Sequence, residues 1–213
     1  MLILAKAMLA MMIGFITSVI FGLVFVPFLK KINIKQSESI FLRGTHSSKE
    51  GTPTMGGIIL IISTLLLSAF LYFDYSAEEP EIATRLLPMI FVTIGFGVIG
   101  FIDDLKKVVF HNTDGISPKA KMTGLTVIAI AYVCMLVFVF KNGTDIYIPF
   151  ADVYWTMPTW LYIVFAIVVI LATTNAVNLT DGIDGLSTSV TTIILTCLTV
   201  ISIVWGVKET TIF

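Results

Sequence analysis

The sequence predicts an all-α protein, a polytopic bundle of helices that cross a membrane. Of its 213 residues 57% are apolar and only 13% are charged, about half of the charged share of an ordinary soluble domain. The apolar residues lie in six long runs whose interiors hold no Asp, Glu, Lys, Arg or His. Such runs are typical of transmembrane helices, and without ionisable groups they do not favour a pump or an ion-coupled transporter.

The net charge and the cysteines exclude two other classes. A net charge of −1, from 13 basic and 14 acidic residues, argues against a basic module that binds nucleic acid. Cys134 and Cys197 both lie inside apolar runs, so we expect no disulfide framework.

We expect one transmembrane domain over residues 1–213 with six spans. A helix needs about 20 apolar residues to cross a bilayer. The runs that meet this requirement lie at residues about 8–29, 56–73, 86–102, 122–140, 159–174 and 186–207. The first run is too long for a signal peptide and has no small-residue cleavage site, so we expect it to be retained. The chain ends soon after the sixth run in a loop-like stretch, which suggests the N-terminal part of a longer chain.

Basic residues are concentrated in two of the loops. The loop after the first span holds five Lys and Arg residues and the loop after the third holds four, whereas the loops after the second and fourth hold one each. By the positive-inside rule the first and third loops are cytoplasmic. The fifth loop, around residues 175–185, joins them by parity, and the N-terminus faces outward.

The fourth loop, on the outer side, predicts a short β-hairpin near residues 145–155. Asp145–Phe150 is a β-prone run, and Tyr154, Trp155 and Trp160 follow it. Aromatic residues of this kind favour the membrane–water interface. We assign this hairpin no chemistry.

The unusual polar residues lie in three clusters, one in each cytoplasmic loop. The clusters are Lys49–Gly57, Asp103–Lys107 and Asn175–Gly185. Because the three loops open on the same side, we expect the clusters to meet at one aqueous surface beside lipid. A reaction between a water-soluble and a lipid-borne substrate needs such a place.

Two adjacent carboxylates, Asp103 and Asp104, end the third span. Helix stability does not explain them, since the C-terminal end of the helix dipole disfavours negative charge by about 0.3–1 kcal/mol. Carboxylate oxygens suit Mg²⁺. Neighbouring helical residues point about 100° apart, so one carboxylate can hold the metal while the other addresses a substrate. The alternative is two solvated carboxylates neutralised by Lys106 and Lys107.

The third cluster has a polar residue at every third position, namely Asn175, Asn178, Asp181 and Asp184. An α-helix would turn the first and last to opposite faces, whereas a 3₁₀ turn would align all four. Gly182 and Gly185 favour such irregular backbone. Opposite a second acidic pair, these residues predict a nucleotide or metal site. The alternatives are a helix cap and a calcium-binding turn.

The first cluster predicts a turn followed by the start of the second span. The Thr52 and Thr54 hydroxyls and the backbone N–H groups can face a phosphate there, with Lys49 as the countercharge. The alternative is that the small residues only allow close helix packing. In the third loop, Lys119 and Lys121 are either phosphate ligands or residues that set the topology.

With all three clusters in view, the chain resembles the polyprenyl-phosphate N-acetylhexosamine-1-phosphate transferase superfamily. Its segments Gly51–Gly57 and Asn175–Asp184 are similar to those of one member family, the phospho-N-acetylmuramoyl-pentapeptide-transferases. The resemblance implies a multi-pass enzyme of the bacterial inner membrane with a cytoplasmic active site. The implied reaction transfers phospho-MurNAc-pentapeptide from UDP-MurNAc-pentapeptide to undecaprenyl phosphate. It forms lipid I and UMP in peptidoglycan synthesis, with Mg²⁺ as cofactor, and so serves cell wall biogenesis, cell shape and cell division.

The resemblance also implies roles for the residues of the clusters. The catalytic residues would be Asp103, Asp104 and Asp184, one of the acidic pair acting on the lipid phosphate as a base or in a covalent route. The candidate metal ligands are Asp103, Asp104, Asp181 and Asp184. The candidate substrate-binding residues are Lys49, Thr52, Thr54, Lys107, Lys119, Lys121, Asn175, Asn178 and Asp181. A homodimer is implied as well.

The chain also departs from that family. Its members have further spans, which carry another metal-ligating Asp in a Gly-Asp-x-Gly-Ser segment, and a His-rich loop, and neither occurs in these 213 residues. We therefore expect the isolated chain to be inactive. One alternative is a related enzyme that transfers GlcNAc-1-phosphate from a UDP-sugar. Another, from a different class, is a non-catalytic membrane scaffold or transporter half.

Overall fold

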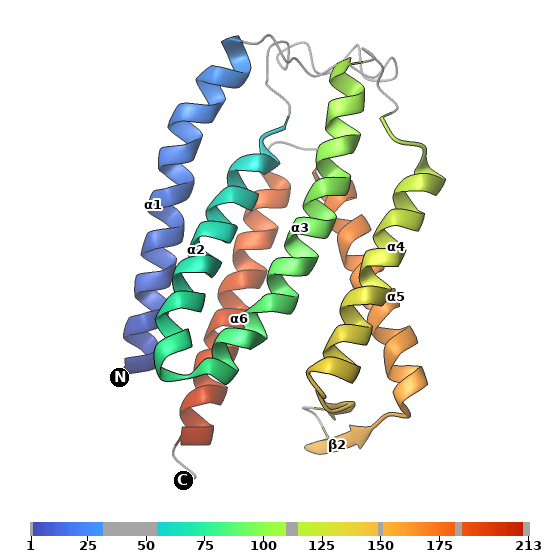
Figure 1. Ribbon diagram of the computed structural model, residues 1–213. Helices are drawn as coiled ribbons and strands as arrows, with labels where there is room; N and C mark the ends of the chain where they lie inside the picture. The colour runs from blue at the N-terminus through green and yellow to red at the C-terminus, as the bar shows by residue number, and fades with distance from the viewer. Residues whose placement is uncertain (1, 32–54, 110–114, 149–150, 182–184, 211–213) are drawn as a thin grey trace. The chain divides into compact units, whose positions relative to one another are not determined.

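The computed structural model confirms an all-α membrane protein with one small β-hairpin (Figure 1). It describes residues 2–31, 55–109, 115–148, 151–181 and 185–210. The elements are α1 (Leu2–Lys31), α2 (Gly57–Glu78), α3 (Pro80–Val109), α4 (Pro118–Cys134), the π-helical turn η3 (Met135–Val139), β1 (Asp145–Ile148), β2 (Val153–Thr156), α5 (Thr159–Thr180) and α6 (Leu186–Thr210). Each of the six predicted spans falls in a helix that is long and apolar enough to cross a membrane.

Large apolar side chains are widely exposed on these helices. Phe15 is 70% exposed, and Leu23 and Phe73 are each 73% exposed. Contact between so much apolar surface and water is unfavourable, whereas a lipid environment suits it. The chain is therefore a multi-pass membrane protein.

The chain forms two compact units. The larger comprises Met12–Ile167, which holds most of α1, the whole of α2 to β2, and the start of α5. The smaller comprises Met1–Met11 and Val168–Phe213.

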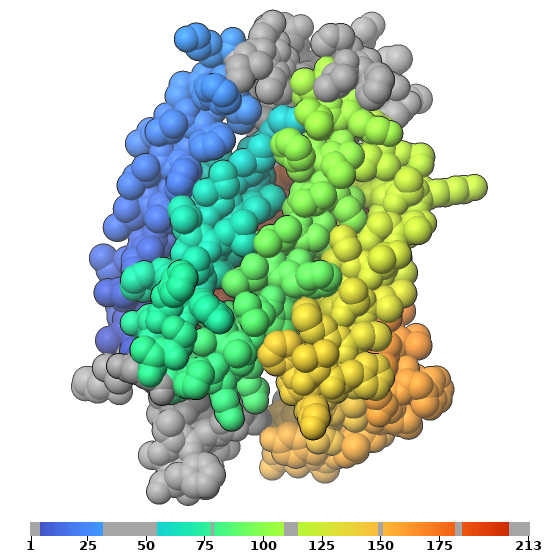
Figure 2. Space-filling model, in the orientation of Figure 1, coloured from blue at the N-terminus to red at the C-terminus, as the bar shows by residue number. Residues whose placement is uncertain are grey.

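In the larger unit α3 packs against both α2 and α4, and Figure 2 shows α3, in green, between them. Small residues allow the close approach. A Cβ at Gly97 would lie 2.7 Å from Cδ1 of Ile61 on α2, and a Cβ at Gly95 would lie 2.8 Å from Cγ2 of Ile128 on α4. Successive helices run antiparallel, so the end of α3 and the start of α4 lie at one end of this unit (Figure 1).

A capped turn starts α4 at that end. The Ser117 hydroxyl accepts a hydrogen bond from the Ala120 N–H at 3.4 Å, and Pro118 follows at the first helical position, where its missing N–H needs no partner. This cap places Lys119 and Lys121 in the first turn of α4.

At the other end of α4 the predicted hairpin is confirmed. β1 and β2 are antiparallel, with Asp145 opposite Thr156 and Ile148 opposite Val153.

In the smaller unit α5 stays α-helical through Asn175 and Asn178 to Thr180. The expectation that a 3₁₀ turn aligns the polar residues is therefore wrong for this stretch. The two glycines that favour irregular backbone come only after Asp181, and Gly185 does adopt a φ of +80°. Asp184 lies outside the described residues.

Candidate active site

Asp103 is a buried carboxylate near the end of α3. Only 6% of the residue is exposed, and three N–H donors surround its side chain. The Lys107 ammonium, one helical turn further on, donates to Oδ2 at 2.8 Å, and the Lys121 ammonium of α4 donates to the same oxygen at 3.4 Å. The Ile116 backbone N–H donates to Oδ1 at 2.9 Å. We call Asp103, Lys107, Lys121 and the backbone of Gly115 and Ile116 the Asp103 cluster.

Gly115 lets the chain before α4 approach Asp103 closely. Its φ is +60°, a left-handed conformation that costs other residues about 1–2 kcal/mol. A Cβ at this position would lie 2.5 Å from Asp103 Oδ1 and 2.8 Å from Lys107 Cε. Glycine is therefore required here both by the backbone conformation and by the space.

The Asp103 cluster fastens α3 to α4. A buried carboxylate without partners is very unfavourable, and here two ammonium groups and one amide offset its desolvation. The donors come from α3, from the segment before α4 and from α4 itself, so the carboxylate fixes the three relative to one another.

Asp104 has different surroundings from those of its neighbour. Its side chain is 37% exposed, and the Lys107 ammonium forms an ion pair with its Oδ1 at 3.7 Å. The Met55 backbone, two residues before α2, also faces this carboxylate. Met55 is buried and has a φ of 69°, so the end of the first cluster meets the acidic pair. The two carboxylates thus have different protein neighbours, and the prediction that one holds a metal while the other addresses a substrate stays a prediction.

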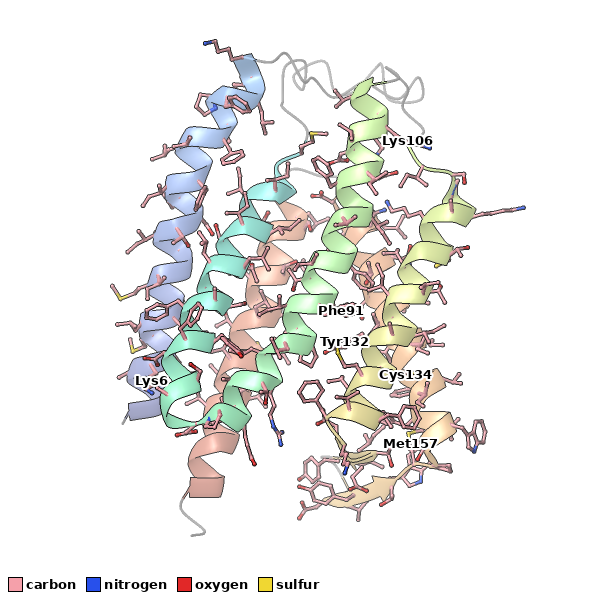
Figure 3. The ribbon with its side chains drawn as sticks, in the orientation of Figure 1. Lys6, Phe91, Lys106, Tyr132, Cys134 and Met157 are labelled. Atoms are coloured by element: carbon pink, nitrogen blue, oxygen red, sulfur yellow. The ribbon has the colours of Figure 1, made fainter. Side chains whose placement is uncertain are left out.

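The alternative of two solvated carboxylates is wrong for Asp103. That residue is buried, and its countercharges are Lys107 and Lys121. Lys106, which the alternative invoked, is exposed to solvent (Figure 3).

A magnesium ion would find only one available carboxylate in the described part of this site. Both oxygens of Asp103 already accept hydrogen bonds, whereas the exposed part of Asp104 is free to meet solvent or a ligand. Among the described residues there is no group of three or more His, Cys, Asp and Glu that could hold a metal. The donor set fits Mg²⁺, which commonly takes one or two protein carboxylates together with phosphate oxygens and water.

The other predicted site residues divide into three groups. Lys119 is exposed on the first turn of α4. Three lie in the smaller unit, where the Asn175 side-chain amide donates to the Leu171 carbonyl at 2.7 Å, while Asn178 and Asp181 are exposed. The remainder lie outside the described residues, namely Lys49, Thr52, Thr54 and Asp184.

Sequence reasoning missed the backbone contributions of Met55, Gly115 and Ile116. A signal for one of them was present, because Asp114-Gly115 is a common turn dipeptide and Ser117-Pro118 is a helix start two residues later. Such signals predict a turn, but they do not predict which side chain accepts a hydrogen bond from the backbone N–H groups of the turn.

Two family models match this chain. The family model described as glycosyl transferase family 4 matches residues 86–213, and the model described as phospho-N-acetylmuramoyl-pentapeptide-transferase signature 1 matches residues 49–61.

Three curated relatives, each named phospho-N-acetylmuramoyl-pentapeptide-transferase, illustrate the similarity. The protein of Acetivibrio thermocellus is 40% identical over 191 residues, which is 89% of this chain and 55% of the relative. The Bacillus subtilis protein is 34% identical over 175 residues, 82% of this chain and 52% of the relative. That of Clostridium beijerinckii is 37% identical over 203 residues, 94% of this chain and 59% of the relative. The chain thus spans a little over half the length of these relatives.

Proposed function

This chain belongs to glycosyl transferase family 4, and from that premise we propose that it serves the transfer of phospho-MurNAc-pentapeptide from UDP-MurNAc-pentapeptide to undecaprenyl phosphate. The products are lipid I and UMP. The names of the curated relatives support this choice, and so does the signature match at residues 49–61. Because the chain spans little more than half of those relatives, the activity is proposed for the whole protein to which these residues contribute.

The observation that carries the proposal is the acidic and basic site at the end of two apolar helices. Asp103, Asp104, Lys107 and Lys121 lie where α3 and α4 reach the edge of their apolar stretches. Both proposed substrates carry phosphate, and one of them also carries a lipid tail. A site of this kind can hold the headgroup among charged groups while the tail stays in the bilayer.

We assign the two carboxylates different tasks. The Asp104 carboxylate is partly exposed, so it is the one that can ligate magnesium or act on the lipid phosphate. Magnesium, when bound, would offset the negative charge of the phosphates. Asp103 orients Lys107 and Lys121, because its oxygens already accept from both ammonium groups and from an amide.

The lysines supply the positive charge that two phosphorylated substrates need. Lys121 is 26% exposed at its side chain and makes the longer contact with Asp103, 3.4 Å, so a small movement can bring its ammonium group to a phosphate. Lys107 is 37% exposed at its side chain and stands between the two carboxylates. Lys49, Thr52, Thr54 and Lys119 are proposed to contact phosphates from the neighbouring segments.

The third cluster is proposed to serve the nucleotide. Asn178 and Asp181 are exposed and available to a ligand, and Asn175 and Asp184 complete the set that the family pattern suggests. The proposal further places the site at the cytoplasmic face of a bacterial inner membrane, with the N-terminus outside, in a protein that forms homodimers.

A chimaeric enzyme tests the proposal. The chain replaces the corresponding segment of the Acetivibrio thermocellus relative, and UMP release is measured with undecaprenyl phosphate and Mg²⁺. We expect turnover with UDP-MurNAc-pentapeptide and little with UDP-GlcNAc. Preference for UDP-GlcNAc would support the related transferase instead, and a folded chimaera inactive with both would overturn the proposal. The 213-residue chain, assayed alone, is expected to be inactive.

A further inference from the structure

The β1–β2 hairpin has one apolar face and one polar face. In its antiparallel register Ile146 pairs with Trp155 and Ile148 pairs with Val153, and these four side chains share one face because alternate residues of a strand point the same way. Ile148 is 37% exposed, Val153 49% and Trp155 50%. A two-stranded sheet this short has no core of its own to cover such a face.

The opposite face is held together by polar contacts. The Tyr147 hydroxyl donates to Asp152 Oδ1 at 2.8 Å, and this bond raises the pKa of Tyr147. The Thr156 hydroxyl donates to the Asp145 carboxylate. The rings of Tyr147 and Tyr154 lie 5.1 Å apart between centroids. This face therefore suits contact with water.

The connections keep the hairpin close to the ends of the membrane spans. Only Met157 and Pro158 separate β2 from α5, and residues 140–144 separate η3 from β1. Thr144 and Met157 close the base of the hairpin, since the Thr144 hydroxyl donates to the Met157 carbonyl at 2.8 Å and the Met157 N–H donates to the Thr144 carbonyl at 3.2 Å. Met157 itself is 6% exposed, so this base is anchored in the protein (Figure 3).

We propose that the hairpin lies on the bilayer, with the face formed by Ile146, Ile148, Val153 and Trp155 buried in the leaflet at the end of α4 that is remote from Asp103. Its short tethers leave it next to lipid, and its apolar face carries no charge that lipid would exclude. Trp160, in the first turn of α5, is 68% exposed and adds an aromatic ring at the same boundary. The occupant of the apolar face is thus phospholipid and not a protein partner.

Depth-dependent quenching of tryptophan fluorescence tests this orientation. One variant keeps Trp155 alone through Trp160→Phe and Trp205→Phe. Its matched control carries Trp155→Phe and Tyr154→Trp as well, which moves the single indole to the opposite face of the same strand. Both chains are reconstituted in phosphatidylcholine vesicles, without and with acyl-chain bromination, and titrated with iodide. Circular dichroism checks the fold.

We expect brominated lipid to remove most of the Trp155 emission and iodide to quench it little. The indole at position 154 should show the reverse and emit at longer wavelength. Strong iodide quenching at both positions would place the hairpin in water and overturn the proposal. Protection of Trp155 from both quenchers would mean that protein covers the face, and lipid quenching at both positions would mean that the hairpin is fully immersed. If Tyr154→Trp prevents folding, Thr156→Trp places the indole on the same polar face.

Discussion

Gly115 lies so close to Asp103 that a Cβ at its position would be 2.5 Å from the Asp103 Oδ1 atom. The next backbone N–H, that of Ile116, donates to this same oxygen at 2.9 Å. The close approach and the hydrogen bond are one arrangement, because only a glycine at φ +60° brings the amide into position. The orientation of Lys107 and Lys121 therefore depends on a residue without a side chain.

Substituting Gly115→Ala should destabilise the chain and lower its proposed activity. The left-handed backbone alone costs alanine about 1–2 kcal/mol, and the new methyl group must also displace the Asp103 carboxylate or the Lys107 side chain. Thermal unfolding in detergent measures the first effect. UMP release by the chimaeric enzyme measures the second.

Gly100→Ala is the matched control for this substitution. Gly100 lies in α3 near the same end, and nothing lies within 4 Å of the position its Cβ would take. Alanine favours a helix over glycine by about 0.5–1 kcal/mol, so this variant should unfold at the same or a higher temperature. Equal behaviour of the two variants would show that the Gly115 contact with Asp103 does not matter.

Lys121→Met should weaken the Asp103 cluster more than Lys106→Met does. Lys121 donates to the buried Asp103 carboxylate from another helix, whereas Lys106 is exposed. We expect Lys121→Met to lower the free energy of unfolding, measured by denaturation in detergent, by about 1 kcal/mol. The loss is no larger because the Lys107 ammonium still donates to the Asp103 carboxylate at 2.8 Å.

A double-mutant cycle with Asp103→Asn isolates the interaction. The loss of unfolding free energy in the double variant should be about 0.5–1 kcal/mol smaller than the sum of the two single losses. The reason is that each substitution removes the same contact, the one between Lys121 and Asp103. Additive losses would mean that Lys121 and Asp103 do not interact in the folded chain.

The fold was largely predictable from the sequence. Six apolar runs of bilayer length leave few options for the fold, and a β-prone run followed by aromatic residues indicated the hairpin. The helices extend beyond the predicted spans. In α3 the helix continues through Asp103 and Asp104 to Val109, where the residues are no longer apolar and the hydrophobic pattern cannot predict the helix end. A 3₁₀ turn that aligns the four polar residues from Asn175 on does not form, because α5 continues as an α-helix to Thr180 whatever the spacing of the polar residues.

The candidate site was only partly predictable. The type and position of Asp103, Asp104, Lys107 and Lys121 marked them as candidates. Their different burial was not visible, because it depends on the tertiary contact between the segment at Ile116 and α3 and on the Met55 backbone before α2. A sequence shows which charged side chains could interact, but it does not show which backbone N–H groups will donate to them.

Asp104→Asn and Asp103→Asn should have distinguishable effects. Loss of the partly exposed Asp104 carboxylate should reduce activity of the chimaeric enzyme by several orders of magnitude, with little change in unfolding temperature, because that carboxylate is assigned to the magnesium and phosphate chemistry. Asp103→Asn should lower the unfolding temperature as well, since it removes the charge that both lysines neutralise.

Activity as a function of Mg²⁺ concentration, together with thermal unfolding, separates these two roles. The Asp104 variant should need a higher Mg²⁺ concentration for whatever activity remains. Full activity in both variants would show that neither carboxylate takes part in the reaction and would overturn the roles proposed for them.

Gly97→Ala should destabilise the α2–α3 pair, and Ile61→Val should restore part of the loss. A Cβ at Gly97 would lie 2.7 Å from Ile61 Cδ1 and 3.3 Å from its Cγ1, so the Ile61 side chain must turn to another rotamer or the two helices must separate. Overpacking of this kind costs about 1–3 kcal/mol, more than the gain of about 0.5–1 kcal/mol that alanine has over glycine inside a helix. Deleting one methyl group by Ile→Val costs about 0.5–1.5 kcal/mol on its own. Valine lacks the Cδ1 atom that the new methyl group would meet, and the double variant should therefore be more stable than Gly97→Ala alone. Thermal unfolding of the wild type, both single variants and the double variant in one detergent measures this. A double variant that is less stable than either single variant would show that α2 and α3 do not meet at these residues.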